Sequence, residues 1–137
     1  MKPLHLTVGL VVVIVFLLTG QYMEYVHNRQ LPDGMRMLYR SRHIYLLLAG
    51  LINLGIGTYF IPMLQGWRKT LQIIGSVLIV LAPGLLLVGF FSEPLKGPDQ
   101  TMVAPLGIFA VALGTVFHFI SSLRPNRGNP TGNGQAD

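Results

Sequence analysis

The sequence contains no cysteine and very little charge. Of its 137 residues, ten are Lys or Arg and five are Asp or Glu, 11% in total, compared with about 25% in an average soluble domain. The absence of cysteine excludes disulfides, thiolate metal sites, iron–sulfur clusters and cysteine nucleophiles. The few charges are also unevenly distributed, and their distribution indicates the fold class.

The charged residues leave four long windows uncharged. These windows hold 21, 25, 23 and 24 residues and run over 3–23, 43–67, 70–92 and 100–123. About 20 mainly apolar residues allow an α-helix to cross a bilayer, whereas a helix on a soluble domain needs charge on its exposed face. The sequence therefore predicts an all-α integral membrane protein, a bundle of four transmembrane helices.

We expect one membrane domain, residues 1–123, with spans at 4–22, 43–61, 70–91 and 103–123. Pro83-Gly84 lies in the middle of the third span. It predicts a kink there, because proline lacks an N–H donor and clashes with the preceding turn. Residues 124–137 are rich in Gly, Pro and Asn and have no apolar periodicity, so we predict a disordered tail.

The first window also fits the apolar core of a signal peptide that follows Lys2. Its apolar run is long for that purpose, and no A-x-A-like cleavage site follows in "LTGQYMEYV". We interpret it as a retained helix. An even number of spans then places both termini on one side of the membrane.

The orientation in the membrane is weakly encoded. The ten Lys and Arg residues divide five to five between the two sides of the predicted bundle, so the positive-inside rule is tied. Lys2 lies close to the first helix, which usually dominates. We therefore expect cytoplasmic termini, in a bacterial inner membrane.

Small residues recur at helical spacing in the second and fourth spans. In lipid, close approach of such residues drives much of the helix association, and an Asn can form a hydrogen bond across an interface. We predict helix packing at these positions and rank a polar ligand groove behind it. The predicted packing residues are Gly50, Asn53, Gly57, Gly107, Ala110 and Gly114.

The four histidines form two pairs that helix depth allows. His5 and His118 belong to the side of the termini, and His27 and His43 belong to the opposite side. Haem iron accepts two histidines as axial ligands. A haem b site on either pair is therefore an alternative to the simpler interpretation, in which each histidine is interfacial or bonded to a neighbouring helix.

Copper is the second cofactor alternative. Met23 and His27 are four residues apart, and Met35, Met37 and His43 follow across a predicted turn. Thioether and imidazole ligands suit Cu(I). Nearby arginines would repel a cation, however, and Met commonly fills gaps in a core. Our leading expectation is that the protein binds no cofactor.

Basic and aromatic residues flank the spans. Lys, Arg and Trp at such positions commonly contact lipid headgroups, and docking of an acidic partner is the alternative. The residues concerned are Arg36, Arg40, Arg42, Trp67, Arg68 and Lys69. Four acidic residues lie in loops or at helix ends, and we interpret them as solvated loop charges: Glu24, Asp33, Glu93 and Asp99.

The pattern of residues favours a role without catalysis. The predicted spans contain no Asp, Glu, Lys or Arg, which are the usual carriers of proton or ion coupling, and no catalytic motif is present. The net charge of +5 lies in loops and tails, so it does not indicate nucleic-acid binding. We expect an accessory, assembly or scaffolding partner of a larger membrane complex or homo-oligomer. A small-molecule channel or a membrane enzyme ranks behind it.

Overall fold

The computed structural model describes residues 1–27, 31–63, 66–97 and 101–123. Over these ranges the chain forms four helices and no strand, which confirms the all-α class. The helices are α1 (Lys2–His27), α2 (Asp33–Tyr59), α3 (Trp67–Lys96) and α4 (Val103–Ser122). The predicted tail, 124–137, lies outside the described residues.

Three of these helices are long and apolar enough to cross a membrane. They are α1 over Lys2–Tyr25 and the whole of α3 and α4. The prediction of membrane-spanning helices is thereby confirmed at the level of length and composition. The α2 helix does not meet the same criterion, so three of the four predicted spans are supported.

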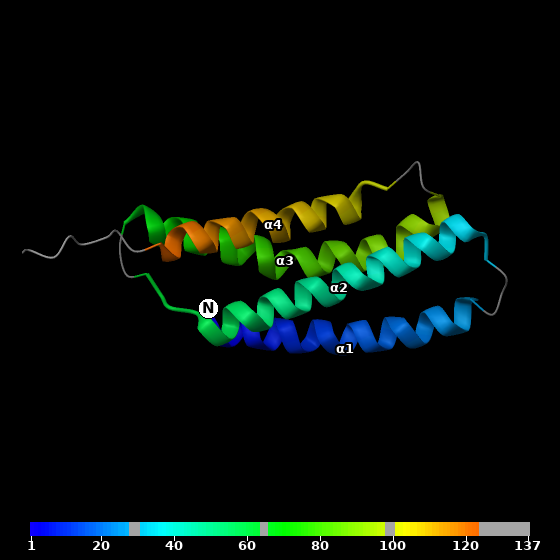
Figure 1. The fold of residues 1–137 in the computed structure, drawn as a ribbon, viewed down its shortest axis with the longest axis horizontal. Helices are drawn as coiled ribbons and strands as arrows, with labels where there is room; N and C mark the ends of the chain where they lie inside the picture. Colours follow the sequence, from blue (N-terminus) through cyan, green and yellow to red (C-terminus); the bar gives the residue numbers. More distant parts are fainter. Residues whose placement is uncertain (28–30, 64–65, 98–100, 124–137) are drawn as a thin grey trace, which may run out of the picture.

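The helices lie side by side in chain order (Figure 1). The α1 helix packs mainly on α2 to form one helical hairpin, and α3 packs mainly on α4 to form a second. Contacts between α2 and α3 join the two hairpins. In the described part of the chain, no backbone contact joins α1 to α4. One end of the molecule, which we call the terminal end, gathers the starts of α1 and α3 and the ends of α2 and α4 (Figure 1). We call the opposite end the elbow end.

Glycine allows the two helices of each hairpin to pack closely. A Cβ atom on Gly57 of α2 would lie 2.8 Å from the backbone nitrogen of Leu6. Between α3 and α4, a Cβ on either Gly75 or Gly114 would lie 2.8 Å from the carbonyl oxygen of the other. Such approaches leave no room for a side chain. Gly50 and Gly107, also in the predicted packing set, likewise face a neighbouring helix.

The α3 helix continues through two prolines. Pro83 and Pro94 lie inside it, and the helix ends only at Lys96. Pro83 is buried. Pro83, the basis of the predicted kink, therefore lies in the interior of a helix, with helical residues on both sides.

Apolar side chains occupy both the interior and the outer surface. The core comprises eight buried residues: Tyr39, Leu46, Ala49, Ala82, Leu86, Phe90, Ala104 and Val111. Large apolar side chains such as Leu17, Leu81 and Phe109 are exposed on the outside. Soluble monomers rarely expose so much contiguous apolar surface, whereas a bilayer accommodates it.

Candidate functional site

A buried hydrogen-bonded network joins all four helices near the terminal end. His5 of α1 places Nδ1 2.9 Å from Oδ1 of Asn53 on α2. Its Nε2 lies 3.0 Å from Oγ of Ser76 on α3, and the same oxygen lies 2.9 Å from Nε2 of His118 on α4. His5 and Asn53 are completely buried. We call these four residues the polar network.

The direction of every hydrogen bond in the polar network follows from Asn53. Its Nδ2 atom donates to the carbonyl oxygens of Ala49 and Ile79, which fixes Oδ1 as the acceptor for His5. A neutral imidazole has one donor and one acceptor, so Nδ1 of His5 donates and Nε2 accepts. The hydroxyl of Ser76 must then donate to His5 and accept from Nε2–H of His118. Neutral His118 is therefore left with Nδ1 as an acceptor.

The structure brings His5 and His118 together, as the sequence allows. Their ring centroids lie 5.8 Å apart in an edge-to-face arrangement. Both Nε2 atoms point at Ser76, and both nitrogens of His5 are hydrogen-bonded. Because an axial ligand must offer iron a free nitrogen lone pair, the two side chains as they lie do not form a haem ligand pair.

The second histidine pair is described only at His43. This side chain places Nδ1 3.0 Å from the hydroxyl of Thr19 and stacks on Phe16 at 4.0 Å. The side chain of His27 lies outside the described part of the structure, so the pairing of His27 with His43 stays a prediction.

The predicted copper ligands are also dispersed. Met23 packs against the core, whereas Met37 is 73% exposed. Among the described residues, no group of three or more His, Asp or Glu side chains is arranged to hold a metal ion. Copper binding that involves these methionines stays a prediction.

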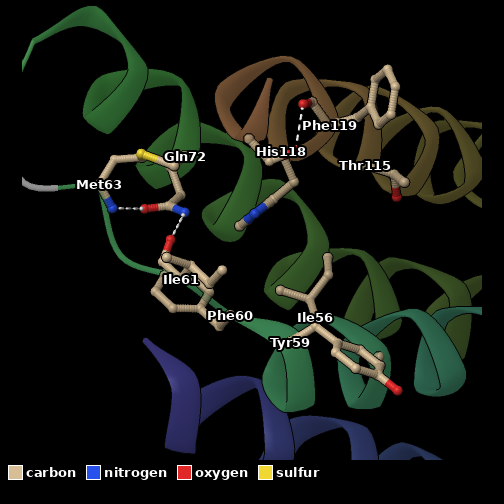
Figure 2. A pocket seen from close by; sticks show the side chains of 11 residues that line it. Ile56, Tyr59, Phe60, Ile61, Met63, Gln72, Thr115, His118 and Phe119 are labelled. Carbon is tan, nitrogen blue, oxygen red and sulfur yellow. Dashed lines mark hydrogen bonds between the residues drawn. The ribbon is translucent and has the colours of Figure 1, made fainter. Parts of the chain in front are cut away.

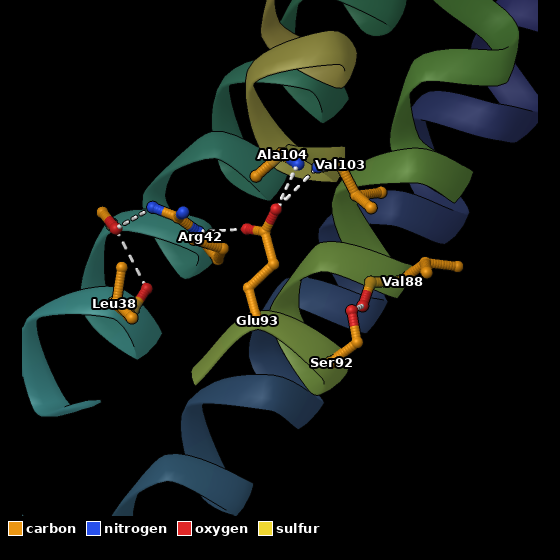
Figure 3. Close-up of polar contacts among 8 residues, drawn as sticks. Leu38, Arg42, Val88, Ser92, Glu93, Val103 and Ala104 are labelled. Carbon is orange, nitrogen blue, oxygen red and sulfur yellow. Dashed lines mark hydrogen bonds and ion pairs between the residues drawn. The ribbon is translucent and has the colours of Figure 1, made fainter. Parts of the chain in front are cut away.

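A second buried polar cluster lies near the elbow end (Figure 3). Nε of Arg42 donates to Oε2 of Glu93 at 2.8 Å. The other carboxylate oxygen accepts from the backbone N–H groups of Val103 and Ala104, at 2.7 and 3.0 Å. The exposed fractions of the Arg42 and Glu93 side chains are 8% and 1%. The cluster therefore connects α2, α3 and the start of α4.

Two sequence predictions are wrong at this cluster. Glu93 was interpreted as a solvated loop charge, but it is buried inside α3 because its carboxylate caps the N-terminus of α4. Arg42 was expected at the lipid headgroups, but it turns inward to this carboxylate. Both residues flank uncharged windows at the same end of the protein, and that common depth was the available signal.

The other flanking residues lie at the surface. Arg36 is paired with Asp33 and partly exposed, and Arg40 is exposed. At the start of α3, the guanidinium of Arg68 lies 5.5 Å from the centre of the exposed Trp67 ring. Lys69 is exposed beside them. Contact with lipid headgroups remains a prediction for these residues.

A cleft of about 320 Å³ opens beside the polar network (Figure 2). His118 projects into it from α4, toward the segment that carries Phe60 and Ile61. That segment is held by Gln72 of α3, which accepts from the N–H of Met63 at 2.9 Å and donates to the carbonyl of Ile61 at 2.8 Å. Ser76 and Gln72 are not among the predicted site residues, although they are polar residues within the third uncharged window.

Comparison with family models, with curated proteins and with solved structures finds no match to this chain.

Proposed function

We propose that α2 is a fourth span and that the protein is a four-span bundle. Within the predicted span, three residues that lower the hydropathy of α2 lie on its inner side: Asn53 is buried in the polar network, and Gly50 and Gly57 face α1. Its exposed side chains from Ile44 onward include Leu48 and Leu51. A helix of this kind presents an apolar surface to lipid although its mean composition is less apolar.

A topology experiment tests the fourth span. The chain has no cysteine, so single cysteines at Gly34, in the first turn of α2, and at Lys69, in the first turn of α3, mark positions on either side of the proposed span. A membrane-impermeant maleimide should label Lys69→Cys from the cytoplasmic side and Gly34→Cys from the opposite side. Labelling of both from the same side would show that α2 does not cross.

Within this bundle, we propose a non-catalytic role as an accessory, assembly or scaffolding partner in the bacterial inner membrane. One observation carries the proposal. The polar side chains of the helix interiors bind one another across helices, in the polar network and in the Arg42–Glu93 cluster. Such bonds hold helices in register and do not line a path across the membrane.

The accessory role predicts a colourless protein that forms a defined assembly. The native mass should be measured in nanodiscs made directly from membranes, together with the visible spectrum and the metal content. A fixed stoichiometry with a larger membrane protein or a second copy supports the proposal. A haem spectrum or stoichiometric copper that disappears in His5→Ala would overturn it.

A further inference from the structure

The cleft beside the polar network has the size and lining of a small-molecule site. Its volume of about 320 Å³ lies in the range of pockets that hold small ligands, about 300–1,000 Å³. The aromatic rings of Tyr59, Phe60 and Phe119 line it, together with Ile56 and Ile61. An apolar ring would find apolar contacts on several sides of this cleft.

The polar groups of the cleft are mostly committed to the protein. Thr115 donates its hydroxyl hydrogen to the carbonyl of Val111, and Ser122 donates to that of Phe119. Gln72 uses both ends of its amide on the segment that follows α2. The two hydroxyls therefore have only acceptor capacity left.

His118 adds an acceptor that the polar network defines. Its Nε2–H is used on Ser76, and the tautomer derived above leaves a lone pair on Nδ1. The Cδ2 edge of the ring packs against α3, where it lies 3.1 Å from the position of a Cβ on Gly75. The opposite edge, which carries Nδ1, is therefore turned away from α3, in a side chain that lines the cleft.

The lining also defines the charge of a ligand. None of the eleven residues that line the cleft is Asp, Glu, Lys or Arg, so an ionic ligand would lose its hydration without gaining a counter-ion. A neutral molecule with an apolar ring and a hydrogen-bond donor matches the lining.

We propose that this cleft binds a neutral aromatic molecule through its phenolic hydroxyl, which donates to Nδ1 of His118. This chemistry is that of the ring of a quinol in the membrane or of a free phenol. The aromatic rings of the cleft hold the ring of the ligand, and the polar network fixes the acceptor by holding the proton of His118 on Nε2. The inference goes beyond the accessory role proposed above and does not depend on it.

A matched pair of ligands tests the hydrogen bond. The full chain in nanodiscs, labelled with ¹⁵N-histidine, is titrated with 4-methylphenol and with 4-methylanisole, which has the same ring and no donor. The phenol should shift the Nδ1 resonance of His118 and bind roughly tenfold more tightly, as expected for one hydrogen bond. Equal binding of the two compounds would overturn the proposal.

A matched pair of variants tests the location. Gly55 lines the cleft, and a Cβ there would meet no atom within 4 Å. Gly55→Leu should therefore fill the cleft, leave the polar network intact and abolish phenol binding. Gly84→Leu, on α3 and equally free of contacts, should bind as the parent does. Binding retained in Gly55→Leu, or lost equally in both variants, would contradict the site.

A third measurement distinguishes the two sources of the ligand. If it comes from the membrane, 4-decylphenol should bind more tightly than 4-methylphenol after correction for partition into the lipid. If it comes from water, the two affinities should be equal. Either result supports the shared chemistry, provided that the corresponding anisole binds more weakly. His118→Phe, which keeps a ring in place, should remove the preference for phenol over anisole.

Discussion

At the scale of the residue, the polar side chains of this protein act in groups. Glu93 serves two helices at once: it neutralises Arg42 of α2 and accepts two backbone N–H groups at the start of α4. Removing one partner of a buried ion pair costs more than removing both, because a charge is otherwise left without compensation. The same reasoning applies to Ser76, which bonds two histidines.

Glu93→Ala should destabilise the protein by about 3–5 kcal/mol. The change leaves the Arg42 guanidinium buried and the N–H groups of Val103 and Ala104 without their acceptor. Unfolding by titration with a denaturing detergent, followed by circular dichroism, measures the loss. The double variant Arg42→Met/Glu93→Leu should recover part of it, and a single variant as stable as the parent would contradict the account.

Ser76→Ala should cost about 1–3 kcal/mol, because both histidines lose their common partner inside the protein. Ser92→Ala is the control on the same helix, since Ser92 donates to the carbonyl of Val88 within α3. The thermal unfolding midpoints of the two variants should therefore differ clearly. An equal decrease in the two unfolding midpoints would show that the polar network contributes no more to stability than the hydrogen bond of Ser92 to Val88.

At the scale of the element, glycines determine how closely the helices pack. Gly75 and Gly84 lie on the same helix but in opposite surroundings. A Cβ on Gly75 meets the backbone of α4, whereas a Cβ on Gly84 meets nothing within 4 Å. The contrast separates the packing effect of a methyl group from its effect on helix propensity.

Gly75→Ala should destabilise the protein by about 1–3 kcal/mol, because the methyl group forces α3 away from α4. Gly84→Ala should be neutral or stabilise it by up to about 1 kcal/mol, since Ala is the better helix former. Detergent-induced unfolding of both variants provides the comparison. A stabilised Gly75→Ala would mean that the two helices do not approach as closely as described.

Much of the arrangement of the helices could be predicted from the sequence. The four helices follow from the spacing of charge, and Gly57 and Gly114 were placed at interfaces because small residues recurred at helical spacing. The depth of His5 and His118 also followed from their positions in the chain. The sequence of a single helix does not determine how that helix is rotated about its axis. Whether Arg42 faces lipid or Glu93 therefore depends on partners far away in the sequence. Ser76 and Gln72 were missed for the same reason.

At the scale of the whole molecule, the two hairpins are the units of assembly. Within each hairpin, glycines bring the helices together; between the hairpins, the polar network and the Arg42–Glu93 cluster make the buried polar bonds. In lipid, preformed helices associate through such contacts.

Co-expressed fragments divided at residues 64–65 should reassemble in the membrane. A tag on the first fragment should recover the second in a one-to-one ratio. The double variant Ser76→Ala/Glu93→Ala should reduce that recovery several-fold, because it removes the polar bonds that join α3 to α1 and to α2. Recovery unchanged by the double variant would show that apolar contacts alone join the hairpins.

The hydrogen bonds of the polar network can form only in the order in which the helices are synthesised. His5 is synthesised before its bonding partner Ser76 and the more distant His118, which follow 71 and 113 positions later. Until α3 has entered the membrane, the imidazole of His5 lacks Ser76, and the amide of Asn53 lacks the carbonyl of Ile79. The α3 helix therefore completes the hydrogen bonding of α1 and α2, and a chain that stops before α3 leaves unsatisfied polar groups in the membrane.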